Sequence, residues 1–72
     1  MSDATYSKRG AAVVIQRPFE KEIILDEPNL EWAIGNIKKN RSVFATEEAY
    51  QAHLDIYLDA QRFLREAIDR AS

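Results

Sequence analysis

The chain has 72 residues, of which 46% are hydrophobic and 31% are charged. A domain of this length buries only about 60% of the surface of its unfolded chain, which leaves little room for an internal catalytic cleft. Ten basic and twelve acidic residues give a net charge of −2 and exclude a global positive field that would attract nucleic acid or an anionic membrane. We therefore expect one small folded domain.

The sequence contains no cysteine, which excludes a disulfide framework and a cysteine-based zinc site and is in keeping with a reducing compartment. The first ten residues lack the apolar core of a signal peptide. No later run approaches the roughly 18 apolar residues of a membrane span. These features predict a cytoplasmic protein with no membrane segment.

The first ten residues of the chain are mainly polar. Residues 1–10 show no periodicity and end in Gly10, a pattern typical of a flexible arm. The following run from Ala11 to Ile15 is short and ends in β-branched residues, which predicts a strand over about residues 11–16.

A second strand is predicted over about residues 19–25, because Phe19, Ile23 and Leu25 alternate with charged residues. A helix start behind Pro18 is the competing interpretation, since Phe19 and Ile23 are also four residues apart. Neither Gly nor Asn separates the two predicted strands, so a tight hairpin between them is not expected. A looser turn through Arg17 and Pro18, or pairing with a second chain, would be needed.

Two helices follow, over about residues 27–39 and 46–71. Asp26 and Thr46 are suited to cap them, and the first helix has an apolar stripe at helical spacing. That stripe consists of Leu30, Ala33, Ile34 and Ile37. The sequence thus predicts an α+β, mainly helical fold, with short N-terminal strands followed by a helical hairpin whose C-terminal helix is long. Residues 11–72 form its single domain.

The second helix carries more apolar surface than the rest of the chain is expected to cover. At 1.5 Å per residue it spans about 37 Å, whereas a compact chain of this length has a radius of gyration of about 11 Å. Ile56, Leu58 and Phe63 lie outside its main apolar stripe. Either a second copy or another protein covers these residues, or the N-terminal strands fold over them.

Trp32 gives a second candidate contact. Helical geometry places it opposite the apolar stripe of the first helix, beside Gly35. A glycine within a helix costs about 1 kcal/mol relative to alanine, and its missing side chain admits another backbone. The two residues form an aromatic-anchor site for a partner, unless the N-terminal strands or arm cover Trp32.

A basic cluster supports a different function, that of a dimeric DNA-binding regulator. Its residues are Lys38, Lys39 and Arg41, with Lys8 and Arg9 added if the arm folds back. The order strand, helix, helix is loosely similar to ribbon-helix-helix regulators, whose paired strand reads the DNA major groove. Here the candidate strand is apolar, the net charge is acidic and the second helix is much longer, so this remains the alternative.

No constellation for catalysis, metal binding or a cofactor emerges. His53 is the only histidine, with no second ligand or nucleophile at a fixed spacing, and we expect it to be structural. The sequence predicts a non-enzymatic protein that needs no cofactor. We expect a small regulatory or accessory protein, antitoxin-like or inhibitor-like, that binds another protein or a second copy. Trp32, Gly35, Ile56, Leu58 and Phe63 are the expected contacts.

Overall fold

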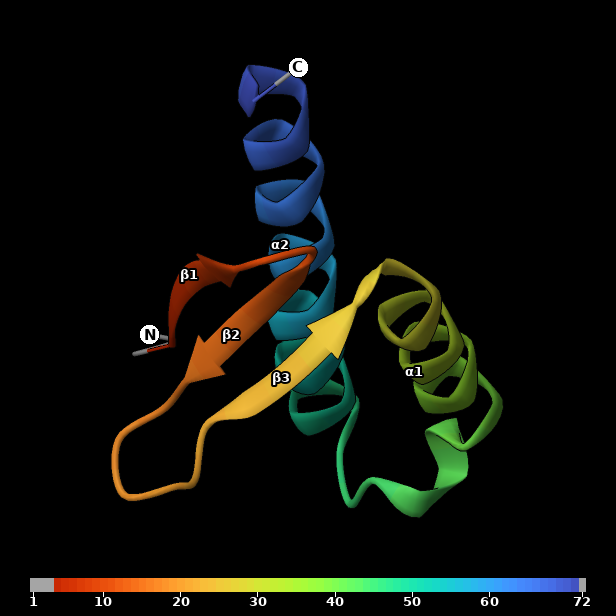
Figure 1. The fold of residues 1–72 in the computed structure, drawn as a ribbon. Coiled ribbons are helices and arrows are strands. Elements are labelled where there is room, and N and C mark those ends of the chain that lie inside the picture. The colour runs from red at the N-terminus through yellow and green to blue at the C-terminus, as the bar shows by residue number, and fades with distance from the viewer. Residues whose placement is uncertain (1–3, 72) are drawn as a thin grey trace.

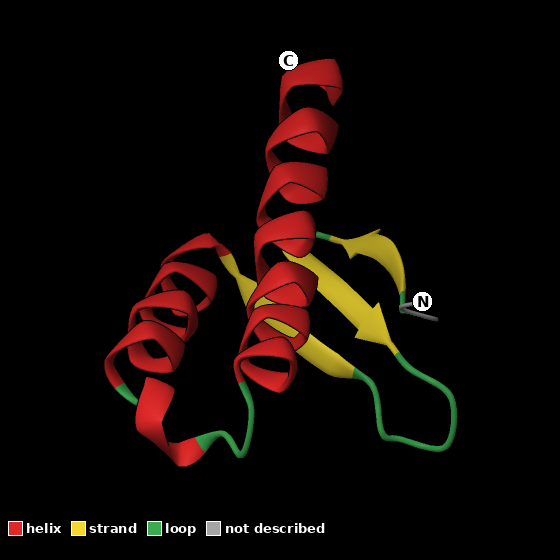
Figure 2. Cartoon of the chain, turned by 180° about the vertical axis from the view of Figure 1, so that it is seen from behind, coloured by secondary structure: helices red, strands yellow, loops and turns green. Residues whose placement is uncertain are grey.

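The computed structural model describes residues 4–71, in which a three-stranded antiparallel sheet precedes two helices (Figure 1). The elements are β1 (Thr5–Arg9), β2 (Ala12–Gln16), β3 (Ile23–Asp26), α1 (Glu27–Lys39), the short 3-10 helix η1 (Arg41–Val43) and α2 (Glu47–Ala71). The strands lie in the order β1-β2-β3, and the two helices lie against one face of the sheet (Figure 2). The predicted α+β class is confirmed.

Strand β1 lies where the sequence predicts a flexible arm. It pairs with β2 along its whole length, from Thr5 opposite Gln16 to Arg9 opposite Ala12. Gly10 begins the two-residue turn with a φ of 61°, the positive value that a type II′ hairpin turn requires at this position. The arm prediction is therefore wrong for residues 5–9, while residues 1–3 lie outside the described part of the chain.

The connection between β2 and β3 is a looser loop that contains a turn over residues 17–20. The backbone N–H of Glu20 donates to the carbonyl oxygen of Arg17 at 3.3 Å. Pro18 holds φ at about −65°, and Phe19 follows with a φ of 63°, which matches a type II turn. This turn keeps residues 19–22 out of the sheet, so the second predicted strand is correct only from Ile23 onward.

Both helices lie close to their predicted limits because their capping residues act as expected. The backbone N–H of Asn29 donates to Oδ1 of Asp26 at 3.0 Å, and that of Ala49 donates to Oγ1 of Thr46 at 3.0 Å. Each cap satisfies one of the N–H groups that the first helical turn leaves free. Helix α1 covers the predicted range and α2 begins one residue later.

The core lies between the sheet and the helices. Val13 and Ile15 of β2 point toward the helices, and Leu30 of α1 is fully buried. The remaining buried members of this cluster are Ile34, Ile37, Tyr50, Leu54, Ile56, Ala60 and Leu64. Antiparallel sheets commonly cover one face in this way. Val14, which alternates with Val13 and Ile15 and so points to the other face, is 4% exposed but is not part of this cluster. The sheet thus covers much of the apolar surface of α2, which is one of the two alternatives that the sequence analysis left open.

Tyr6 attaches β1 to the long helix. Its hydroxyl donates to the backbone carbonyl oxygen of Ile56 at 3.3 Å, and its ring lies 6.1 Å from that of Phe63. Burial raises the pKa of the Tyr6 hydroxyl, and the negative charge of Asp59 raises it further. Tyr6 is therefore the residue through which the first strand closes over α2.

The predicted overhang of α2 is present. The described chain measures 40 × 25 × 18 Å, and the long axis matches a helix of 25 residues. The last turns of α2 extend beyond the sheet and beyond α1 (Figures 1 and 2). Leu64 is the last buried residue of the core cluster, and Ile68 is already 37% exposed.

Candidate functional site

The structure covers most of the apolar arc that the sequence assigns to a partner. Ile56 is only 5% exposed and belongs to the core, so its expected position outside the core is wrong. Leu58 and Phe63 are half-buried and pack against the same core. The physical reason is the sheet: Tyr6 of β1 lies against the ring of Phe63, and Val13 and Ile15 of β2 belong to the same cluster as Ile56.

Trp32, in contrast, lies on the open surface of α1. It is 70% exposed, while Leu30 and Ile34 on the opposite side of the helix are buried. Pro28, Trp32, Gly35 and Lys39 follow one another at spacings of four, three and four residues, which places them in one stripe. All four are exposed, and so are the neighbouring Glu31 and Lys38. We call these six residues the Trp32 face. The exposure of Trp32 confirms the outward position predicted for it.

Gly35 lies at the middle of this face and performs no packing role within the described chain. A Cβ atom placed on it would meet no described heavy atom within 4 Å beyond its own helix and chain neighbours. Its φ is not in the left-handed region, so the backbone does not require glycine either. The residue lowers helix stability by about 1 kcal/mol relative to alanine and leaves a flat spot beside an exposed indole.

The predicted basic cluster does not form one patch. Arg9 lies opposite Ala12, which lies opposite Asp26, so Lys8 and Arg9 are at the end of the sheet where α1 begins. Lys38 and Lys39 are at the other end of α1, which is about 20 Å long at 1.5 Å per residue. The fold therefore separates the two halves of the proposed nucleic-acid surface. The three paired strands of the described chain also depart from the ribbon-helix-helix order, which has a single strand before its two helices.

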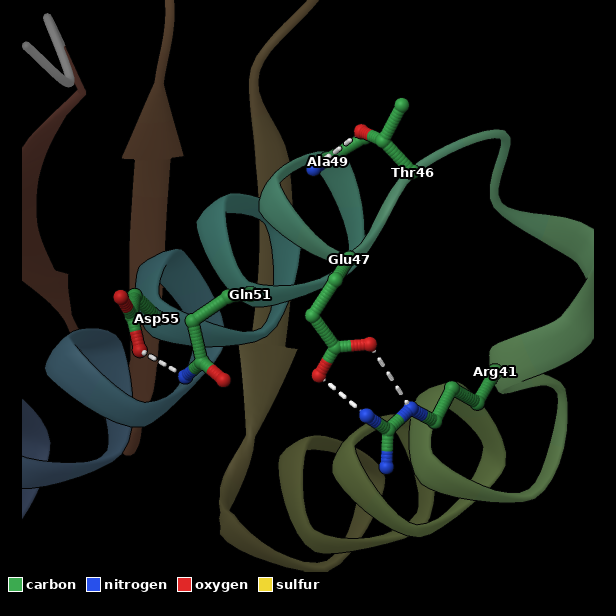
Figure 3. A network of polar contacts seen from close by, with 6 residues as sticks. All are labelled: Arg41, Thr46, Glu47, Ala49, Gln51 and Asp55. Atoms are coloured by element: carbon green, nitrogen blue, oxygen red, sulfur yellow. Dashed lines mark hydrogen bonds and ion pairs between the residues drawn. The ribbon is translucent and has the colours of Figure 1, made fainter.

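Arg41 is engaged in holding η1 against α2 (Figure 3). Its guanidinium binds both carboxylate oxygens of Glu47, with Nε donating to Oε2 at 3.1 Å, and its Cζ lies 5.0 Å from the centre of the Tyr50 ring. The hydrogen bond to Glu47 raises the pKa of Arg41. Arg9 likewise forms an ion pair with Glu22 at 3.5 Å. Both cations have carboxylate partners, which reduces their capacity for phosphate.

His53 belongs to an aromatic cluster at the beginning of α2. Its ring lies 5.4 Å from that of Phe44 and 5.1 Å from that of Tyr57. Burial lowers the pKa of His53, and the positive charge of Arg17 lowers it further. Over the described residues, no group of three or more His, Cys, Asp or Glu side chains could hold a metal ion. The surroundings of His53 are those of a packed aromatic residue.

The looser turn that the sequence analysis places at Arg17 and Pro18 is present, but the exposed ring of Phe19 at this turn was not predicted. Its ring is fully exposed, its φ is positive, and an Arg17–Glu20 ion pair of 3.2 Å spans the turn. An open hollow of about 540 Å³ lies beside it, lined also by Thr5 and Lys21. The available sequence signal was Pro18, which favours the second position of such a turn, but the third position normally holds Gly or Asn.

No protein family, curated protein or solved structure matches this chain. Between residues 4 and 71, no helix is both long enough and apolar enough to span a membrane. The candidate site is therefore defined by the geometry of the Trp32 face alone.

Proposed function

We propose that this protein is a small, non-enzymatic binding module that acts by docking the Trp32 face of α1 against another protein surface. Such a protein regulates or assists its partner by occupying it. The observation that carries the proposal is the exposed indole of Trp32 beside the unfilled position at Gly35.

These two features are costly to the isolated chain for separate reasons. An exposed tryptophan leaves a large apolar ring in water, although aromatic rings contribute most when buried. A glycine in the middle of a helix lowers its stability. Both costs are offset on binding, because tryptophan is a preferred anchor at protein interfaces and a missing side chain allows close backbone approach.

The long helix supports the fold in this proposal and does not provide the main contact. Ile56 is in the core and Phe63 is in contact with Tyr6, so neither presents a free anchor. The binding hypothesis from the sequence is thus retained, and its surface moves from α2 to α1. Trp32 and Gly35 carry it, and Leu58 contributes to packing against the core.

The test compares partner capture by the wild-type chain with capture by two face variants, Trp32→Ala and Gly35→Gln. Trp32→Ala should weaken binding about 30-fold or more, as expected for a loss of at least about 2 kcal/mol at an interface anchor. Gly35→Gln should weaken binding while stabilising the helix, which separates lost contact from lost fold. The matched control is Phe19→Ala, which removes an exposed ring elsewhere.

Binding is to be measured by crosslinking in the producing cells, identification of the captured protein, and titration of that purified protein with each variant. Circular dichroism confirms that the variants fold. A specific partner whose affinity is unchanged by Trp32→Ala and Gly35→Gln would contradict the proposal.

A further inference from the structure

The charges of α1 are distributed unequally along the helix. Glu27 and Glu31 lie in its N-terminal half, and Lys38 and Lys39 lie in its C-terminal half. This arrangement complements the helix dipole. It also places Glu31 four residues before Gly35 and Lys39 four residues after it, both on the Trp32 face. The face is thus oppositely charged at equal distances on either side of its flat centre.

We infer that the occupant of the Trp32 face is a second copy of this chain, with the two α1 helices antiparallel and crossing at Gly35. This inference rests on the proposed function and specifies its partner. In a two-fold symmetric pair, residues equally far from the crossing point on opposite sides face one another. Glu31 then lies opposite Lys39 of the second copy, and the symmetry creates this pair twice.

The same geometry accounts for the two costly residues at the centre. Gly35 faces Gly35, where the absence of both side chains lets the helices come close, toward the short end of the roughly 8–10 Å range of interaxial distances. Trp32 packs across the flat centre and ends near Lys38 of the second copy. An aromatic face attracts a cation in that position.

Other occupants fit this charge pattern less well. A parallel pair of α1 helices would place Glu31 against Glu31 and Lys39 against Lys39, and like charges in contact are unfavourable. A nucleic acid would meet the carboxylate of Glu31 as well as the two lysines. An antiparallel second copy matches both halves of the face at once.

The interface is small. Helix α1 has 13 residues and a length of about 20 Å, so the contact is below the roughly 1,600 Å² of a standard stable complex. We therefore expect a weak dimer that dissociates on dilution. Charged pairs at its border contribute mainly to orientation and specificity.

The first experiment is analytical ultracentrifugation of the full chain over a range of concentrations at low salt. The wild type should show a monomer–dimer equilibrium. Trp32→Ala and Gly35→Gln should each raise the dissociation constant about tenfold or more, whereas the control Phe19→Ala should leave it unchanged. Trp32 is the only tryptophan, so its fluorescence should shift to shorter wavelength as the wild type associates.

The second experiment tests the orientation by charge exchange. Glu31→Lys alone and Lys39→Glu alone each place like charges opposite one another in the antiparallel pair, and both should weaken association several-fold. The double variant Glu31→Lys with Lys39→Glu restores the opposite pairing and the wild-type net charge. It should recover association. Glu48→Lys, at an exposed position on α2, is the control for net charge.

Three outcomes would overturn the inference: a monomer at every concentration, a dimer unaffected by Trp32→Ala and Gly35→Gln, or a double charge variant that stays as weak as its parents. The first outcome leaves the proposed function standing if a different protein binds in a Trp32-dependent manner. A dimer that behaves as expected supports both. Circular dichroism of each variant excludes loss of fold as the cause.

Discussion

Phe19 has a positive φ that phenylalanine rarely adopts. Its ring is fully exposed, so no burial of apolar surface offsets the cost of this backbone conformation. A left-handed backbone costs an L-residue other than glycine about 1–2 kcal/mol. Pro18, the Arg17–Glu20 hydrogen bond and the ion pair across the turn hold this conformation in place. The strain is therefore local to the turn and can be relieved by one substitution.

Phe19→Gly should raise the free energy of unfolding by about 1 kcal/mol, because glycine accepts this conformation without strain. Gly10→Ala, at the other positive φ, should lower it by a similar amount. Urea denaturation followed by circular dichroism measures both changes. A decrease for Phe19→Gly would show that the ring makes stabilising contacts.

His53 should make stability depend on pH. Its folded-state pKa is below the ordinary value of 6.5, chiefly through burial, so the unfolded chain binds the proton more readily. The contribution of neutral His53 is fully present above the unfolded pKa and is lost as pH falls through 6.5 toward the lower folded pKa.

His53→Gln removes this titration. Between about pH 7 and about pH 5, the thermal midpoint of the wild type should therefore fall more than that of the variant. Carboxylates titrate equally in both proteins, so the difference between the two slopes isolates His53. Parallel slopes would show that the histidine is equally solvated in both states.

At the scale of elements, β1 depends on its contact with α2. Tyr6 is the only large apolar residue of this strand, and it provides both the hydrogen bond to Ile56 and the ring contact with Phe63. The other four residues of β1 are exposed. The strand is held by pairing with β2 and by this one side chain.

Tyr6→Ala should lower the free energy of unfolding by about 2–3 kcal/mol, since a half-buried ring is lost and Phe63 is uncovered. Tyr6→Phe keeps the ring and should cost about 1 kcal/mol or less. Denaturant unfolding measures the two values, and binding of a hydrophobic dye reports the uncovered surface of α2. Equal costs for the two variants would assign the anchoring to the hydroxyl alone.

The elements that sequence reasoning predicted well are those with local signals. Caps at Asp26 and Thr46 and the spacing of the apolar stripes define both helices from neighbouring residues alone. Strand β1 has one local signal, Gly10 at the first position of its hairpin turn. Its residues are mostly polar, however, and its hydrogen bond to Ile56 joins residues 50 positions apart. The burial of Ile56 was missed because it depends on how the sheet and α1 pack against α2.

The candidate site shows the same division. The outward position of Trp32 follows from helical spacing within α1, so the sequence predicts it correctly. Whether Lys8 and Arg9 lie near Lys38 and Lys39 depends on the register of the sheet. No local sequence pattern predicts that register. The pairing of the strands places the two pairs of cations at opposite ends of α1.

At the scale of the whole molecule, stability is distributed unevenly along α2. Its buried residues run from Tyr50 to Leu64, and the turns beyond them extend past the sheet. The hydrogen bonds of those last turns are therefore exposed and open without disturbing the core.

Backbone amides of residues 68–71 should exchange with solvent about tenfold or more faster than those from Leu54 to Leu64. Hydrogen exchange followed by NMR measures both sets in one sample. Repeating it at high protein concentration should slow exchange in the centre of α1 more than at the end of α2 if the Trp32 face is the dimer contact. Slow exchange to the last residue of α2 would instead place a contact on the overhang.

The contact between Tyr6 and Ile56 has a consequence for biosynthesis. Strand β1 precedes α2 in the chain, so it leaves the ribosome before the helix that supports it. An isolated two-stranded hairpin is at best marginally stable in water, so β1 and β2 gain their support only when the carbonyl of Ile56 and the ring of Phe63 have emerged. Until then, Val13 and Ile15 lack the cover of α2 and are open to chaperones or to other nascent chains.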